Sequence, residues 1–336
     1  MSLLRILLLP ISLLYYLYQL IRNKFYDQGI IESKHFDIPT ISVGNLSVGG
    51  TGKTPLVNYI ISNFKNNYKI AFLSRGYGRD SSGYILADEK TLVTKIGDEP
   101  FLIKKNHGEI LVVVSEDRVL GVSKTINENS GVQFFILDDA FQHRRLKCDL
   151  NIVVTKYDNP YYSDFVLPTG NLREPISGIK RAQIIVISKC PNNLGEGQRQ
   201  EIIKKIKPSD QQKVFFTTIV YDESLVGRVD LNVMDLTESS VLLVTGIADS
   251  SDLEKYLNNK KISFEHLKFN DHHIYSKADI EKIKSKSKNK KIITTEKDYH
   301  KILDIKSFEN MHYIGIKVKF LDGKNNFNSE IEKVIN

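Results

Sequence analysis

The sequence of 336 residues contains only two cysteines, Cys148 and Cys190, and neither stands in a CxxC or Cys/His spacing. Structural zinc sites need several such ligands at short, regular spacings, so the pattern argues against a zinc site. Two isolated thiols are instead typical of a protein that is kept in a reducing compartment.

The chain also lacks low-complexity segments and any signature of an RNA- or DNA-binding module. Lys and Arg outnumber Asp and Glu by 47 to 40, which gives a formal net charge of +7. Much of the excess lies in the lysine-rich residues 282–291, which we interpret as a solvated face; attraction to an anionic surface is the alternative. Without a recognisable module this charge does not indicate nucleic-acid binding. A monomer is the default expectation.

The first 25 residues form the one long apolar stretch, MSLLRILLLPISLLYYLYQLIRNKF, with a single charge at Arg5 before Arg22 and Lys24. No small-residue cleavage site follows, which argues against a signal peptide. The stretch is of borderline length for a spanning helix, whereas Arg5, Pro10 and three tyrosines suit a helix at the membrane interface. We expect a membrane-associated helix over 1–25, either spanning or interfacial, with the rest of the chain cytoplasmic. A buried amphipathic core helix is the alternative.

Short apolar, β-branched runs alternate with helix-length segments after residue 26, which predicts an α/β fold with a parallel sheet covered by helices on both faces. We expect a first domain over 26–217 and a smaller α/β domain over 240–316. Residues 218–239 are expected to link them, and 317–336 to form a tail for which packing against the first domain is one arrangement. The predicted strands fall within 39–45, 69–78, 109–117, 132–141, 150–158, 182–189, 240–249, 262–271 and 290–302.

A phosphate-binding loop stands between the first predicted strand and its helix. SVGNLSVGGTGKTP, residues 42–55, fits the pattern G-x-x-x-x-G-K-[ST] except that Ser47 replaces the first glycine. In such loops backbone N–H groups and a helix N-terminus bind phosphate, the lysine reaches the β and γ phosphates, and the hydroxyl residue binds Mg²⁺. The strand–loop–helix context favours a P-loop NTPase-like nucleotide site over a plain glycine turn. The residues expected to bind nucleotide are Ser47, Gly49, Gly50, Thr51, Gly52, Lys53 and Thr54.

An acidic pair follows another predicted strand, in FFILDDAFQHR. Because the partner strand of a phosphate loop commonly ends in a metal-binding carboxylate, we expect Asp138 to bind Mg²⁺ together with Thr54. Asp139 would orient the metal or the phosphate; the reverse assignment stays open, and a helix cap is the alternative for one of the two. Thr155-Lys156-Tyr157-Asp158 fits the base-reading motif of GTPases, but no DxxG accompanies it, so a GTPase or ATPase switch acting on a protein partner is kept only as the alternative function.

Five further motifs follow along the chain: LSRGYGR (73–79), GDEP (97–100), LPTGNLREP (167–175), DHH (271–273) and TTEKD (294–298). Each alone is more often structural than catalytic. In this order and spacing, together with the phosphate loop and LDDAFQHR, they resemble the tetraacyldisaccharide 4'-kinase family, the lipid A 4'-kinases. The resemblance runs from the apolar N-terminus to about residue 300. That family also accepts a hydroxyl residue at the position of Ser47.

The resemblance implies an ATP- and Mg²⁺-dependent kinase that phosphorylates the 4'-hydroxyl of a tetraacyl glucosamine disaccharide 1-phosphate, the lipid A precursor, to give lipid IVA. It also implies a location at the cytoplasmic face of the inner membrane. Carried over by motif, Asp98 would accept the proton of the sugar hydroxyl, tuned by His272 or its neighbour His273, with Lys53 as the catalytic lysine and Glu99 as a further Mg²⁺ ligand. The residues implied to line the nucleotide or lipid headgroup site are Arg75, Tyr77, Arg118, His143, Arg173 and Glu174.

Overall fold

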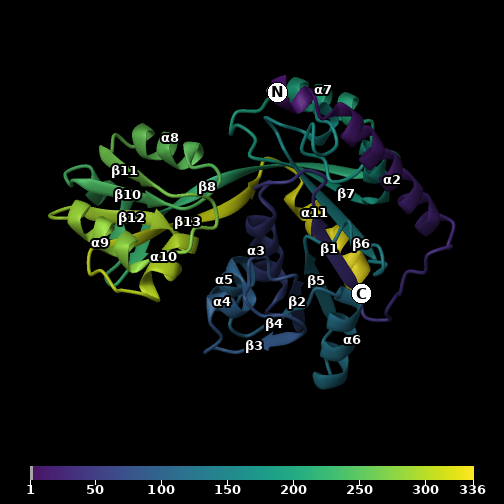
Figure 1. Cartoon of the computed structure of the whole chain (residues 1–336), viewed down its shortest axis with the longest axis horizontal. Coiled ribbons are helices and arrows are strands. Elements are labelled where there is room, and N and C mark those ends of the chain that lie inside the picture. Colours follow the sequence, from purple (N-terminus) through teal and green to yellow (C-terminus); the bar gives the residue numbers. More distant parts are fainter. Residues whose placement is uncertain (1–2) are drawn as a thin grey trace. The chain divides into compact units, whose positions relative to one another are not determined.

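The structure is a computed structural model that describes residues 3–336, with side-chain environments described from Arg5 onward. The chain folds into two compact α/β units (Figure 1). Unit 1 contains the residues up to Ile219 and Val318–Asn336, and unit 2 contains Val220–Lys317. The chain therefore leaves unit 1 and returns to it near the C-terminus.

Unit 1 is built on a sheet with the strand order β8-β7-β6-β1-β5-β2-β4-β3. Its neighbouring strands are parallel except β3 and β4, which are antiparallel. Every residue of β1, β2, β5 and β7 is buried, which confirms the expected parallel strands covered on both faces. The strands are β1 Thr40–Gly44, β2 Ile70–Ser74, β3 Ile85–Ala87, β4 Leu111–Val114, β5 Phe134–Asp138, β6 Leu150–Lys156, β7 Ile184–Ser188 and β8 Lys213–Gly227, which continues into unit 2.

Helices cover both faces of this sheet because alternate strand residues point to opposite sides. In β5, Phe134 and Ile136 join the core that includes α3, α5 and α11, whereas Phe135 and Leu137 pack in the cluster that includes α6. The helices of unit 1 beyond the N-terminal segment are α3 Lys53–Phe64, α4 Val93–Ile96, α5 Asp98–Asn106, α6 Arg118–Glu128, α7 Glu196–Ile206 and α11 Lys324–Ile335, with the 3-10 turns η1 Tyr161–Ser163 and η2 Ile176–Arg181.

The C-terminal tail packs back on unit 1. Helix α11 buries Phe327 and Ile331 in the same core as α3. The ring centroid of Phe327 lies 4.8 Å from that of Phe320 and 5.3 Å from that of Phe215, so aromatic contacts connect the returning chain to β8.

Unit 2 is a smaller parallel sheet with the strand order β11-β10-β12-β13, flanked by three helices. Residues 218–239, expected to link the domains, continue β8 and then form β9 (Leu231–Asn232) and the turn η3 (Val233–Leu236). They place Leu225, Val233 and Leu236 in the core of unit 2, and the antiparallel pairing of β8 with β9 accounts for the absence of a helical pattern there. The other elements are β10 Val241–Thr245, α8 Ser251–Asn259, β11 Phe264–Lys268, α9 Lys277–Lys286, β12 Lys291–Thr295, α10 Glu296–Leu303 and β13 Met311–Phe320.

The N-terminal segment forms α1 (Leu3–Ile6) and the 19-residue α2 (Leu9–Asp27), with Pro10 in the first turn, where its missing N–H costs no hydrogen bond. The polarity of α2 is inverted relative to a core helix, because its buried side chains are Ser12 and Asn23. Among the described residues, none of the helices combines the length and apolar content that crossing a membrane requires. The exposed apolar residues of this segment are Ile6, Leu7, Leu9, Ile11, Leu13, Leu14, Tyr16, Leu17, Tyr18, Ile21 and Phe25.

Candidate active site

Three of the motifs and Arg118 meet at one edge of the sheet in unit 1. Strands β1, β5, β2 and β4 are neighbours and parallel, so the loops that follow them leave from the same edge. The phosphate loop follows β1, the acidic pair begins at the last residue of β5, the SRGYGR turn follows β2, and Arg118 follows β4. Val43 of β1 is in register with Asp138 of β5, which sets the acidic pair beside the phosphate loop.

The phosphate loop leads directly into α3, whose first two residues are Lys53 and Thr54. Gly52 caps this helix with a φ of 88°, and Gly49 has a φ of 98°, values that favour glycine at both positions. Ser47 is buried and pairs with Leu172, so the substituted first position is part of a short bridge rather than a free turn. The helix N-terminus and the glycine-rich backbone together make a site for an anion such as phosphate.

Two side chains that sequence reasoning missed support this loop. The Asn45 amide donates a hydrogen bond of 3.1 Å to Thr51 Oγ1, which closes the loop across its mouth. Ser188, the last residue of β7, donates through Oγ to the Thr51 carbonyl at 2.6 Å. Asn45 lies inside the quoted motif, whereas Ser188 could be found only from its position at the carboxyl end of a strand.

Lys53, Asp139 and Arg173 form a chain of charges at the loop. Lys53 Nζ lies 3.4 Å from Asp139 Oδ1, and Arg173 Nη1 lies 2.7 Å from Asp139 Oδ2. Burial favours the neutral carboxyl, but the two cations outweigh it, and the pKa of Asp139 is lowered. The LREP motif thus places one guanidinium next to the phosphate lysine.

Asp138 is the buried member of the pair and fits a metal ligand. Its Oδ2 accepts a hydrogen bond from Ser74 Oγ at 3.4 Å, whereas its buried Oδ1 has no hydrogen-bond partner among the described residues. Burial, followed by the charges of Asp139 and Glu99, raises the pKa of Asp138 to about 7, against the opposing effect of Lys53 and Arg118. A buried carboxylate oxygen without a donor is a suitable ligand for Mg²⁺, which commonly uses one or two carboxylates together with substrate phosphates.

The GDEP and SRGYGR turns are packed against each other. A Cβ atom at Gly97 would lie 2.7 Å from the Tyr77 carbonyl oxygen, and one at Gly76 would lie 2.7 Å from the Ile96 carbonyl oxygen. Helix α5 begins at Asp98, directly after this contact and beside the turn that carries Arg75. The Asp98 side chain is buried. The charge of Glu99 contributes to the raised pKa of Asp138, so the GDEP turn lies near the acidic pair.

Arg118 and His143 border the acidic pair. Arg118 is buried and donates to the Ser115 carbonyl at 3.3 Å and the Asp138 carbonyl at 3.5 Å. His143 lies with Nε2 4.0 Å from Asp117 Oδ1. Burial, and then the charge of Arg118, lowers the pKa of His143 to about 4, so this imidazole is neutral at pH 7.

Glu174, implied to line the substrate site, lies in the protein interior. Both of its oxygens accept from Arg181 Nη2, at 2.9 and 2.8 Å, and they also accept from Gln142 at 2.9 Å and Asn23 at 3.1 Å. Gln142 in turn donates to the Asn45 carbonyl at the entrance of the phosphate loop. Glu174 therefore connects α2, the LDDAFQHR loop and the phosphate loop, and a direct substrate contact by its side chain stays a prediction.

The DHH and TTEKD motifs lie in unit 2, and the pairing of Asp98 with a histidine there stays a prediction. His273 is built into the unit: its ring stacks on Phe269 at 4.6 Å and its Nε2 lies 3.1 Å from Asp279. His272 has a φ of 53°, and a third of its side chain is exposed. The choice between His272 and His273 stays a prediction.

Asp298 of TTEKD has a structural role in unit 2. It is fully buried and accepts hydrogen bonds from the Gly246 N–H at 2.9 Å, Tyr275 Oη at 3.0 Å and Thr295 Oγ1 at 2.7 Å. These bonds fix the start of α10 against the end of β10. The motif thus supports the segment that carries the histidines.

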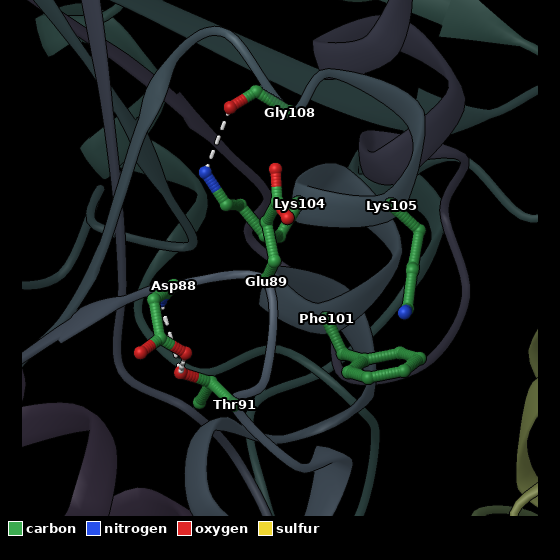
Figure 2. A pocket seen from close by; sticks show the side chains of 7 residues that line it. All are labelled: Asp88, Glu89, Thr91, Phe101, Lys104, Lys105 and Gly108. Atoms are coloured by element: carbon green, nitrogen blue, oxygen red, sulfur yellow. Dashed lines mark hydrogen bonds between the residues drawn. The ribbon is translucent and has the colours of Figure 1, made fainter.

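A separate polar pocket of about 330 Å³ lies beside α5 (Figure 2). Its charged lining residues are two acids, Asp88 and Glu89, and two bases, Lys104 and Lys105, so their charges balance. Helix α5 contributes Phe101, Lys104 and Lys105 to this pocket, whose lining does not include Asp98 at the helix start. The pocket lacks the glycine-rich backbone and the cationic excess of the phosphate loop.

The fold and this site define a P-loop phosphotransferase, in which a nucleotide phosphate site adjoins carboxylates that can hold a metal and accept a proton. The family described as Tetraacyldisaccharide-1-P 4'-kinase matches residues 4–336. The chain belongs to this family, and it is a kinase of lipid A biosynthesis.

Relatives and a solved structure agree with this assignment. Tetraacyldisaccharide 4'-kinase of Flavobacterium johnsoniae is 44% identical over 100% of this chain and 98% of that protein. The enzyme of Phocaeicola vulgatus is 38% identical over 96% and 93%. The crystal structure of LpxK from Aquifex aeolicus in complex with ATP has a TM-score of 0.81 at 32% identity and covers 99% of this chain and 100% of that one. The alternative of a GTPase or ATPase switch is thereby disfavoured.

Proposed function

We propose that this enzyme transfers the γ-phosphate of ATP to the 4'-hydroxyl of a tetraacyl glucosamine disaccharide 1-phosphate, with Mg²⁺, at the cytoplasmic surface of the inner membrane. The observation that carries the proposal is the meeting of Lys53, Asp138, Asp139 and the GDEP carboxylates at one edge of the sheet of unit 1. Phosphoryl transfer depends on positioning and charge neutralisation, and this site offers both.

The proposed roles follow from the chemistry of each group. Lys53 and the N-terminus of α3 bind the β and γ phosphates, and Arg173 adds a second cation beside Asp139. Bound Mg²⁺, held by Asp138 with Thr54 and Glu99, would supply further neutralisation of the phosphate charge. Asp98 accepts the hydroxyl proton while the sugar oxygen bonds to phosphorus and the bond from the γ-phosphorus to ADP breaks. His272 would tune Asp98 from unit 2.

The inverted polarity of α2 supports a location at the membrane surface. Its outer face carries Leu13, Leu14 and Leu17, which are 59%, 69% and 46% exposed, while polar side chains face the protein. Exposed apolar patches of this kind mark interaction surfaces, and a tetraacylated substrate remains in the bilayer. A helix lying in the interface would bring the site to that substrate; co-sedimentation with anionic vesicles measures this association.

The test is a transfer assay in detergent micelles with Mg²⁺, labelled ATP or GTP, and tetraacyldisaccharide 1-phosphate. We expect label to pass from ATP to the lipid. The Asp98→Asn variant should lose at least about 100-fold in kcat while ATP binding stays within about twofold, because general-base catalysis contributes that much. The exposed Asp210→Asn is the matched control.

The outcomes separate the parts of the proposal. Wild-type protein that hydrolyses nucleotide without labelling lipid would refute the kinase function. Full transfer by Asp98→Asn, with Asp210→Asn equally active, would refute only the role of Asp98.

A further inference from the structure

Helix α2 is hydrogen-bonded to the LPTGNLREP segment through three side chains. Ser12 Oγ donates to Thr169 Oγ1 at 2.7 Å, and Asn23 Nδ2 donates to Glu174 at 3.1 Å. Between them, Tyr15 Oη donates to the backbone carbonyl of Arg173 at 2.6 Å. The helix with the exposed apolar face is therefore attached to the segment that supplies the guanidinium of the site.

The same segment is hydrogen-bonded to the phosphate loop. The Val48 N–H donates to the Asn171 carbonyl at 2.8 Å, and the Arg173 N–H donates to the Leu46 carbonyl at 2.7 Å. The backbone of Arg173 is thus held on both sides, by the phosphate loop through its N–H and by Tyr15 through its carbonyl. Its side chain then meets Asp139 at 2.7 Å.

We propose that Tyr15 is a positioning residue for phosphoryl transfer, which holds Arg173 at Asp139 and so connects the membrane-facing helix to the catalytic centre. The inference rests on the proposed function and extends it to a residue outside the site. Tyr15 never touches nucleotide or lipid headgroup in this role; it acts through the backbone of Arg173.

The surroundings of Tyr15 suit this role. Gln19 Nε2 donates to Tyr15 Oη at 2.9 Å, which directs the hydroxyl proton toward the Arg173 carbonyl. The ring of Tyr15 packs against the cluster that contains Leu46, Leu172 and Phe141, so the hydroxyl is held at a fixed position. Neighbouring Tyr16 and Tyr18 are 37% and 59% exposed.

Tyr15→Phe removes only the hydroxyl and tests the inference. Tyr68→Phe is the matched control, because Tyr68 Oη donates one hydrogen bond of 3.0 Å to Asn336, elsewhere in unit 1. In the micelle assay we expect Tyr15→Phe to lower kcat about threefold to tenfold, as one lost hydrogen bond allows. The KM values for ATP and lipid should stay within about twofold, with the melting temperatures of both variants within a few degrees of each other.

A double mutant shows whether the effect runs through Arg173. In an Arg173→Lys background, Tyr15→Phe should change kcat less than about twofold, because the guanidinium that Tyr15 positions is already absent. Equal losses in both backgrounds, or equal kcat for Tyr15→Phe and Tyr68→Phe, would overturn the inference while the kinase function stands. If Tyr15→Phe does not fold, Gln19→Leu takes its place, because it removes the hydrogen bond that Gln19 donates to Tyr15 Oη. Gln19→Leu must then lower kcat in the wild-type background and change it less than about twofold in the Arg173→Lys background. A wild-type enzyme that does not label lipid would overturn the proposed function and this inference together.

Discussion

The replacement of Glu174 by alanine should be among the most destabilising single changes in unit 1. Glu174 is 1% exposed, and its side chain accepts four hydrogen bonds, two of them from Arg181. Arg181 has a side chain that is 20% exposed, and its guanidinium lies 4.4 Å from the centroid of the Phe141 ring. The substitution removes the counter-ion of this largely buried cation.

The magnitude follows from the loss of one partner of a buried ion pair. Such a loss costs about 3 to 5 kcal/mol, since the remaining charge stays desolvated. The amides of Gln142 and Asn23 also lose an acceptor. We therefore expect the free energy of unfolding to fall by about 4 kcal/mol, or roughly 10 °C in melting temperature for a unit of this size.

Differential scanning calorimetry measures this change directly. Glu196→Ala is the matched control, since Glu196 pairs with Arg199 on the surface and its side chain is 65% exposed; such pairs contribute about 0 to 1 kcal/mol. One degree of melting temperature corresponds to roughly 0.5 kcal/mol of unfolding free energy or less. A melting temperature of Glu174→Ala within about 2 °C of that of the control would therefore refute the structural role. If the same variant also raised the KM for lipid, Glu174 would instead be a substrate contact, as its motif implies.

Two further predictions concern the GDEP turn and the N-terminal helix. Gly97→Ala should cost about 2 to 3 kcal/mol and lower kcat, because φ is 86° and the added Cβ would meet the Tyr77 carbonyl; thermal melting and the transfer assay measure both effects. Gly78→Ala, with a φ of 74° and open space around the Cβ, should show the backbone cost alone, and equal effects in both variants would contradict the packing argument. Leu14→Asp with Leu17→Asp should weaken binding to anionic vesicles by at least about tenfold, and unchanged co-sedimentation would argue against the interfacial helix.

The parts of the fold that depend on local pattern could be predicted from the sequence. The continuous apolar runs form buried parallel strands, because the hydrophobic pattern and the composition of a strand can be read within its own segment. The phosphate loop could also be located, since its glycines, lysine and following helix are contiguous. The strand that ends in Asp138 was expected beside the phosphate loop, and β5 does pair with β1. The places of β2 and β4 in the sheet could not be predicted in the same way, because strand order is set by long-range pairing. That order is what brings Asp138, Ser74 and Arg118 together.

The supporting residues of the site escaped sequence reasoning for a related reason. Ser188 follows an ordinary apolar strand, and only the position of β7 in the sheet shows that its hydroxyl reaches Thr51. Thr155 of the GTPase-like TKYD match has a local role instead, since its hydroxyl accepts a hydrogen bond from the Tyr161 N–H. A side chain whose partner is distant in sequence carries no local signal of its function.

The N-terminal helix has a mainly apolar sequence, but its few polar side chains form hydrogen bonds to the rest of the protein. Its leucines indicate a hydrophobic environment, but composition alone does not say whether that environment is the protein core or a lipid surface. The structure shows the inward contacts of this helix: the buried Ser12 and Asn23 and the partly buried Tyr15 form hydrogen bonds to the segment beside the phosphate loop. If the helix only anchored the protein, these inward bonds could be lost without consequence for kcat. Their location at Arg173 and Glu174 argues that the proposed attachment to the membrane surface and the order of the catalytic centre depend on the same helix.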